Sequence, residues 1–115
     1  MHELSIAMSI LEIAEEESAR RGGLQVLAVH VRLGLLAGIG KYALIFSYEM
    51  ACRNSPLATS HLVVEEVPGV IYCGTCDALR SAGSPEWFCC PVCGSLTSQL
   101  VQGKELEVVS LEVEE

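Results

Sequence analysis

The cysteine residues carry the clearest chemistry of this chain. The sequence contains two Cys-x-x-Cys pairs, Cys73 with Cys76 and Cys90 with Cys93, separated by 13 residues. Each pair can direct two sulfur atoms of one tight turn at the same ion, and Pro91 favours such a turn in the second pair. Four thiolates brought together in this way form a tetrahedral site, whose usual occupant is zinc. The spacing therefore predicts a structural metal site, with a disulfide pair or a chance repeat of the motif as the alternative.

The two remaining cysteines are expected to have other roles. Cys89 directly precedes Cys90, but only Cys90 keeps the two-residue spacing to Cys93, so we expect Cys90 to be the ligand. Cys52 lies in an apolar run with helical spacing, where a free cysteine behaves as a small buried hydrophobic residue. Iron competes with zinc, because Cys-Pro-x-Cys-Gly also resembles the rubredoxin iron site. Rubredoxins are rich in aromatic residues, however, and only three aromatic side chains flank this site, which favours zinc.

The amino terminus, Met1-His2-Glu3, provides a second set of donor atoms for a metal ion. The bulky His2 favours retention of Met1 with a free amine. That amine, the His2 backbone nitrogen and the His2 imidazole can form fused chelate rings, and the Glu3 backbone nitrogen could complete a planar set. This geometry is typical of nickel(II) or copper(II) rather than zinc. A terminal histidine is more often exposed to solvent and binds no metal, so this alternative for His2 stays open. His30 and His61 are expected to be structural or surface residues.

The composition limits the function classes. The chain has 7 basic and 15 acidic residues, which argues against binding to nucleic acid or to an anionic membrane. No secretory leader is visible, and the glutamates of the first helix exclude a membrane span. We therefore expect a soluble, cytoplasmic protein with reduced cysteines. No catalytic arrangement has a recognisable context, and Gly38–Lys41 lacks the full P-loop pattern, so no enzyme is expected.

The hydrophobic pattern predicts the elements that must position these sites. Apolar residues recur with helical spacing over 4–20 and 41–53, and strands are predicted over 24–34, 60–67 and 104–113. The apolar positions of the first helix form a wide arc, which predicts covering on more than one side: Leu4, Ile6, Ala7, Met8, Ile10, Leu11, Ile13 and Ala14. One face of the first strand is predicted to contain Leu27, Val29, Val31 and Leu33.

The predicted fold class is α+β. We expect a three-stranded sheet with two helices, and an inserted zinc-ribbon-like module with two Cys-x-x-Cys turns. Residues 1–68 are assigned to the main α/β domain, which the final strand within 98–115 completes. Residues 69–97 are assigned to the zinc-binding module, which carries Gly, Ser and Pro between its turns.

Several motifs together resemble the HypA/HybF family of hydrogenase maturation factors over essentially the whole chain. The cysteine pairs resemble the zinc signature of the family but are common to many proteins, and their combination with the Met-His-Glu start is specific. The other matching segments are Met1-His2-Glu3-Leu4-Ser5, Phe46-Ser-Tyr-Glu49 and Val64-Glu-Glu-Val-Pro68. Two positions depart from the usual pattern: Cys89 adds a fifth thiol, and Asp77 stands where glycine is common in such turns.

The resemblance implies a nickel metallochaperone. It implies that His2 binds nickel, that Met1 and Glu3 contribute main-chain atoms, and that zinc in the cysteine module is structural. The implied partners are the accessory GTPase HypB and the large subunit of NiFe-hydrogenase, and in some bacteria the family also serves urease maturation through urease accessory proteins. The alternative function is a zinc-ribbon adaptor or scaffold that transfers no nickel.

Overall fold

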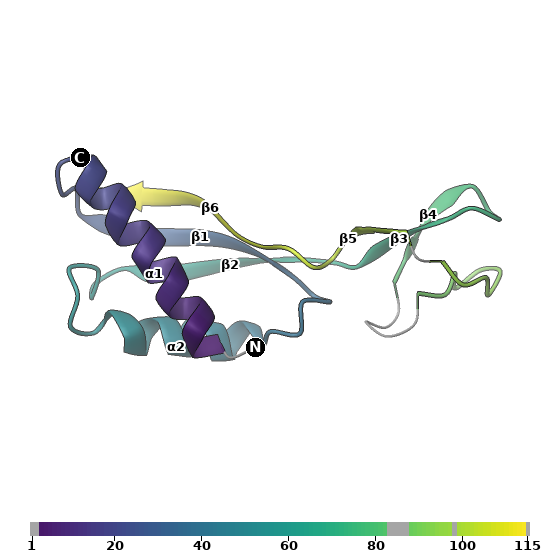
Figure 1. Ribbon diagram of the computed structural model, residues 1–115, viewed down its shortest axis with the longest axis horizontal. Helices are drawn as coiled ribbons and strands as arrows, with labels where there is room; N and C mark the ends of the chain where they lie inside the picture. The colour runs from purple at the N-terminus through teal and green to yellow at the C-terminus, as the bar shows by residue number, and fades with distance from the viewer. Residues whose placement is uncertain (1–2, 83–87, 98, 115) are drawn as a thin grey trace. The chain divides into compact units, whose positions relative to one another are not determined.

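The computed structural model describes residues 3–82, 88–97 and 99–114 of the 115-residue chain. The elements follow the order α1 (Glu3–Arg20), β1 (Val26–Gly34), α2 (Lys41–Cys52), β2 (His61–Val67), β3 (Val70–Cys73), β4 (Ala78–Ser81), β5 (Leu100–Gln102) and β6 (Leu106–Val113) (Figure 1). Among these residues, no helix is both long enough and apolar enough to cross a bilayer.

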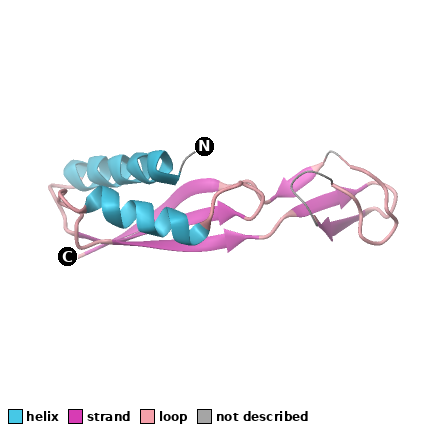
Figure 2. Ribbon diagram, turned by 90° about the horizontal axis from the view of Figure 1, so that it is seen from below, coloured by secondary structure: helices cyan, strands magenta, loops and turns pink. Residues whose placement is uncertain are grey.

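The contacts within the chain define two compact units. The first unit contains Met1–Arg32, Ile39–Glu65 and Glu107–Glu115, and the second contains Leu33–Gly38 and Glu66–Leu106. In the first unit the strands form a three-stranded sheet of order β2-β1-β6, and the two helices pack against each other (Figure 2). The α+β prediction of a three-stranded sheet with two helices is therefore confirmed, and both predicted helices agree with α1 and α2 to within one residue at either end.

Helix α1 buries a narrower arc than its sequence predicts. The buried residues are Ile6, Ala7, Ile10, Leu11 and Ala14. Leu4, Met8 and Ile13 are each about half exposed, so the prediction of covering on more than one side is wrong for these residues. The apolar arc is wider than the surface that one neighbouring layer can cover. The helix ends at Arg20 and is followed by Gly22 and Gly23, whose positive φ angles allow the Gly23 N–H to donate to the Ser18 carbonyl at 2.8 Å.

Helix α2 presents one buried stripe to the core. Leu44, Tyr48 and Cys52 recur every four residues and are almost completely buried. The Tyr48 hydroxyl lies 2.6 Å from Ser60 Oγ, and Ser60 Oγ donates to the Leu57 carbonyl at 2.6 Å. This chain of hydrogen bonds satisfies the buried polar atoms and fixes the segment between α2 and β2 against the helix.

Strand β1 changes the face that it buries part-way along. Val26 and Ala28 are buried at even positions, whereas Val29, Val31 and Leu33 are buried at odd positions. The buried positions therefore switch from even to odd residue numbers between Ala28 and Val29. Leu27 is consequently 40% exposed, and the prediction that it shares the buried face is wrong.

The opposite face of β1 carries charge. His30 Nε2 lies 2.9 Å from Glu112 Oε1, and Arg32 lies between Glu65 and Glu107 at 3.7 and 3.6 Å. These carboxylates are largely exposed, so the helices cover the face that contains Val29 and Val31. His30 thus forms an ion pair across the sheet when it is protonated.

The second unit contains a small sheet that the sequence pattern did not predict. Its order is β4-β3-β5, and both pairs are antiparallel. Strands of three or four residues are too short to show a hydrophobic period, which is why only the cysteine turns were visible in the sequence. The register of β3 with β4 places Ile71 opposite Arg80 and Cys73 opposite Ala78.

Candidate metal centre

The first cysteine pair lies in the turn of a β-hairpin. Cys73 ends β3 and pairs with Ala78, the first residue of β4, so the turn is formed by residues 74–77. The Cys76 backbone N–H donates to Cys73 Sγ at 3.4 Å. Asp77, with a φ of 51°, is the one non-glycine residue with positive φ in the described part of the chain. The left-handed conformation turns the chain back directly after the second cysteine.

The second cysteine pair repeats this arrangement. The Cys90 N–H donates to the Ser95 carbonyl at 2.9 Å, and the Gly94 N–H donates to the Cys90 carbonyl at 2.8 Å. The Cys93 N–H donates to Cys90 Sγ at 3.5 Å, and Gly94 has a φ of 77°. Each turn therefore directs a backbone N–H at the first sulfur of its own pair, which stabilises a thiolate there.

The two turns bring four sulfur atoms together. The Sγ atoms of Cys73, Cys76, Cys90 and Cys93 all lie within 4.8 Å of one another. Two distances across the pairs are 3.5 Å, from Cys73 to Cys93, and 3.9 Å, from Cys76 to Cys90. A tetrahedral site with zinc–sulfur bonds of about 2.3 Å separates its sulfurs by about 3.8 Å. The four thiols therefore fit a single tetrahedral metal ion, and all six cysteines of the chain are free rather than joined in disulfides.

The sulfurs of the cluster differ in acidity. The hydrogen bond from the Cys93 backbone lowers the pKa of Cys90 to about 6, whereas hydrogen bonding with the Cys93 side chain raises the pKa of Cys76 to about 11. The Ser95 side chain lowers the pKa of Cys93. Without an ion the thiols thus share protons, and a divalent cation would replace those protons when it binds.

The other two cysteines lie apart from this cluster. The backbone of Cys89 forms an isolated bridge with Leu96, and its sulfur is not a member of the four-sulfur group. Cys52 is buried, as the sequence predicts, with Sγ 3.6 Å from the Glu49 carbonyl. Burial raises the pKa of the Cys52 thiol, so this side chain stays neutral and contributes to packing.

Of the predicted amino-terminal site, Met1 and His2 lie outside the described residues. Glu3 begins α1 and is partly buried. Its Oε2 accepts a hydrogen bond from the backbone N–H of Gly40, the N-cap residue of α2, at 3.4 Å. The carboxylate thereby links the start of one helix to the start of the other. His61 is exposed, and His30 contacts Glu112, so these two histidines are not gathered with a third ligand in the described part of the chain.

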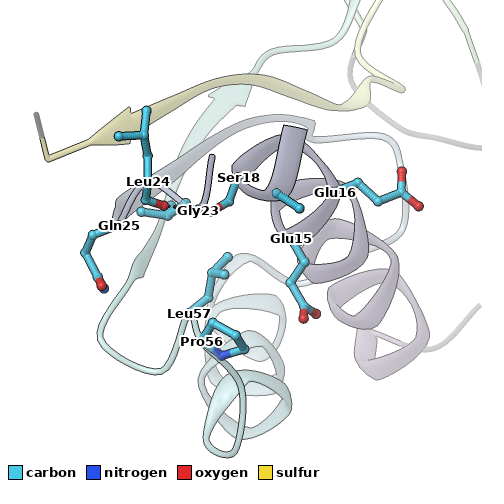
Figure 3. A pocket seen from close by; sticks show the side chains of 10 residues that line it. Glu15, Glu16, Ser18, Gly23, Leu24, Gln25, Pro56 and Leu57 are labelled. Carbon is cyan, nitrogen blue, oxygen red and sulfur yellow. Dashed lines mark hydrogen bonds between the residues drawn. The ribbon is translucent and has the colours of Figure 1, made fainter. Parts of the chain in front are cut away.

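A surface hollow of about 450 Å³ lies near the end of α1 (Figure 3). It is lined by the α1–β1 turn and by Pro56 and Leu57. The Ser18 hydroxyl donates to the Leu24 carbonyl at 2.7 Å, and the carboxylates of Glu15 and Glu16 point in different directions (Figure 3). The hollow therefore brings no nucleophile and base together, and the cysteine cluster remains the centre with the clearest chemistry.

Comparison with known proteins identifies the family. A family model described as "Hydrogenase/urease nickel incorporation, metallochaperone, hypA" matches residues 1–113. The chain belongs to the HypA family. A hydrogenase maturation factor HypA from Roseiflexus sp. (strain RS-1) is 44% identical over 115 residues, covering 100% of this chain and 94% of the relative. Another from Chloroflexus aurantiacus (strain ATCC 29366 / DSM 635 / J-10-fl) is 46% identical over 112 residues, covering 97% and 98%.

A solved HypA structure has the same fold. The solution structure of the Ni metallochaperone HypA from Helicobacter pylori aligns with a TM-score of 0.68, covering 98% of this chain and 97% of that chain. The sequence identity is 22%, so this likeness concerns the fold alone. The predicted family and fold class are thus confirmed. The HypA family consists of nickel metallochaperones for hydrogenase maturation, and an adaptor that carries no nickel is not favoured.

One candidate functional residue beside the cysteine cluster, Arg80, was not identified from the sequence pattern. The neighbouring thiols of Cys76 and Cys90 raise the pKa of the Arg80 guanidinium. Arg80 follows Cys76 by four residues and lies on β4 opposite Ile71, a register that exists only in the folded hairpin. The sequence offers one indication of its importance, because Arg80 is one of two basic residues within 66–106.

Proposed function

We propose that this chain carries nickel(II) at its amino terminus and delivers it during the maturation of NiFe-hydrogenase. Membership of the HypA family over residues 1–113 supports the proposal. The Met1 amine, the His2 imidazole and the intervening backbone nitrogen provide donors suited to planar nickel coordination. Delivery requires a site that releases its ion, and a terminal site of this kind is easier to empty than a closed one.

Glu3 contributes to this nickel site through its main chain. Its carboxylate accepts the hydrogen bond from Gly40, so the side chain is engaged with the neighbouring helix. The same contact holds the first turn of α1 against the start of α2. The ligand set that we propose therefore consists of His2 with main-chain atoms of Met1 and Glu3.

We assign structural zinc to the four-cysteine cluster. The observation that carries this assignment is the mutual approach of the Sγ atoms of Cys73, Cys76, Cys90 and Cys93 to within 4.8 Å. Zinc bound by four thiolates stabilises a small fold and leaves no open coordination position. An iron ion bound by the same four sulfurs would make the protein visibly red, so an absorption spectrum of the purified protein distinguishes the two metals.

The proposed domain organisation follows from these two metals. Residues 1–68, completed by the final strand within 98–115, form the nickel-binding domain. Residues 69–97 form the zinc-binding module. This division separates the cargo site from the structural site, so a variant at one of them is expected to leave the metal content of the other unchanged.

The proposed partners are those of a cytoplasmic maturation pathway. They are the accessory GTPase HypB and the large subunit of NiFe-hydrogenase, with urease accessory proteins as further partners, since the family description includes urease. The chain itself acts as a carrier rather than as an enzyme. Its excess of acidic residues over basic ones suits partners with basic or apolar surfaces.

Nickel titration of a matched pair of histidine variants tests the proposal. His2→Ala should lose stoichiometric nickel binding while it keeps its zinc and its fold. His61→Ala is the control, because His61 is exposed and lies outside the proposed site. Calorimetry gives the nickel stoichiometry, and elemental analysis gives the zinc content. Equal nickel binding by the two variants would refute the amino-terminal site.

A further inference from the structure

The side chain of Ser95 joins the two cysteine turns. Its hydroxyl lies 3.3 Å from Cys93 Sγ and 3.2 Å from the hydroxyl oxygen of Thr75. Thr75 belongs to the first turn, residues 74–77, whereas Ser95 directly follows the second cysteine pair and Gly94. A chain of three polar atoms, Cys93 Sγ, Ser95 Oγ and Thr75 Oγ1, therefore connects one turn to the other.

The backbone of the second turn fixes the place of Ser95. The Cys90 N–H donates to the Ser95 carbonyl at 2.9 Å, and the Gly94 N–H donates to the Cys90 carbonyl at 2.8 Å. These two bonds close the chain around Cys93, and Ser95 is partly buried there. The hydroxyl is thus held beside the Cys93 sulfur by the same hydrogen bonds that form the turn.

Cys93 is the sulfur of the cluster on which such a partner has the largest effect. Cys73 and Cys90 are buried, and each accepts a hydrogen bond from a backbone N–H of its own turn, at 3.4 and 3.5 Å. Cys93 is the exposed member of the four. Protons and electrophiles reach an exposed thiolate before they reach a buried one, so the centre is most easily opened at Cys93.

The hydroxyl chain suits both protonation states of this sulfur. When the sulfur carries its proton, the Cys93 thiol donates to Ser95, and Ser95 donates to Thr75. A sulfur bound to a metal ion has lost its proton and can only accept. Because a hydroxyl is both a donor and an acceptor, Ser95 can then donate to Cys93 while Thr75 donates to Ser95. Loading with a metal therefore reverses the direction of the chain without moving its atoms.

We propose that Ser95 is a positioning residue of the cysteine centre, whose hydroxyl donates to the Cys93 thiolate of the loaded site and ties the second turn to the first through Thr75. This inference rests on the proposed assignment of a divalent ion to the four cysteines. A hydrogen bond to a thiolate stabilises its charged form and withdraws electron density from the sulfur. Ser95 thus slows the loss of the metal through its exposed ligand.

A matched set of variants isolates the hydroxyl. Ser95→Ala removes it, Ser95→Thr keeps a hydroxyl at the same position, and Thr75→Val removes only the far end of the chain. Ser81→Ala is the control, because Ser81 is an exposed serine at the end of β4. The zinc content of the unmodified protein is measured first. One zinc ion per chain supports the underlying assignment, and the absence of zinc would refute that assignment before any variant is compared.

Competition with a chromophoric chelator then gives the zinc affinity of each protein. For Ser95→Ala we expect an affinity about 10-fold lower, the lower end of the usual effect of removing a partner of a metal ligand. Thr75→Val should lose less, because Ser95 still reaches the sulfur. Ser95→Thr and Ser81→Ala should match the unmodified protein. A variant that does not hold zinc is refolded with cobalt(II), whose thiolate charge-transfer bands should move to longer wavelength when the hydrogen bond to Cys93 is lost.

Alkylation supplies a readout that a general loosening of the fold would change differently. With zinc bound, iodoacetamide should modify Cys93 faster in Ser95→Ala than in Ser81→Ala, as followed by peptide mass spectrometry. Cys73 is the internal reference, because its sulfur is buried and accepts from the Cys76 N–H. The proposal is overturned if Ser95→Ala matches the unmodified protein in zinc affinity, if Ser95→Thr loses as much affinity as Ser95→Ala, or if alkylation of Cys73 and Cys93 accelerates equally.

Discussion

Asp77 and Gly94 occupy equivalent positions in the two cysteine turns. Each residue directly follows the second cysteine of its pair, and their φ angles are 51° and 77°. Glycine adopts this conformation without strain, whereas a residue with a Cβ atom does so less readily. Aspartate is among the residues that tolerate it, and the Asp77 carboxylate accepts a hydrogen bond from the Tyr72 hydroxyl. The departure from glycine at position 77 is therefore compatible with the same turn.

This equivalence predicts the effect of adding a side chain to the second turn. Nothing lies within 4 Å of a Cβ atom placed on Gly94, so Gly94→Ala adds only backbone strain. We expect a loss of about 1–2 kcal/mol in the free energy of unfolding of the zinc-loaded protein. The control is Gly74→Ala in the first turn, where the nearest atom is 4.0 Å away and φ is not in the left-handed region. Equal stability of the two variants in denaturant titrations would contradict this explanation of the turn.

The buried hydroxyl of Tyr48 provides a second test. Tyr48→Phe removes the hydrogen bond to Ser60, but Ser60 keeps its bond to the Leu57 carbonyl and is not left without a partner. We therefore expect a cost of about 1 kcal/mol, the usual net contribution of one hydrogen bond. Tyr42→Phe on the same helix is the control, since Tyr42 is 78% exposed. Urea unfolding should distinguish the two variants, and an equally stable pair would argue against the Tyr48–Ser60 contact.

The buried thiol of Cys52 predicts a dependence on alkaline pH. Burial raises its pKa, so the folded state favours the neutral thiol. The resulting stability is complete below the unfolded-state pKa of about 8.5 and is lost as the pH rises through the higher folded-state pKa. In this range the free energy of unfolding should decrease by up to about 1.4 kcal/mol per pH unit from this group.

Cys52→Ala isolates that contribution. The other cysteines titrate in both proteins, so the difference between the two pH profiles belongs to position 52. Denaturant unfolding of the zinc-loaded proteins at pH 7.5 and 9.5 is the measurement. The stability of Cys52→Ala should fall less steeply with pH than that of the unmodified protein. Parallel profiles would show that the Cys52 thiol does not titrate abnormally.

The sequence was most informative where structure is local or strongly periodic. The helices α1 and α2 were predictable because each has a long apolar pattern and a clear stop, as at Gly22 and Gly23. The four clustered cysteines occur in two pairs whose spacing itself implies a turn. Strand β3 was not predictable, because a run of four residues is too short to show a hydrophobic period. Its pairing with β4 also depends on contacts that exist only in the folded chain.

Two features required the tertiary structure. The change of buried face between Ala28 and Val29 reverses the alternation on which the prediction for Leu27 depended. The influence of the Cys76 and Cys90 thiols on the pKa of Arg80 arises only in the folded hairpin, whose register sets Arg80 opposite Ile71. The proposal of an amino-terminal nickel site came from the residue types of Met1-His2-Glu3 together with the family resemblance. Those residue types alone left open the alternative that His2 binds no metal.

Nickel binding by the zinc-loaded protein with and without a free Met1 amine tests the carrier role most directly. One form begins at Met1, and the other carries a Gly-Ser extension that converts this amine into a peptide bond. We predict stoichiometric nickel binding to the first form and markedly weaker binding to the second, with equal zinc content in both. Equal nickel affinity of the two forms, or no stoichiometric binding to the first, would contradict the account.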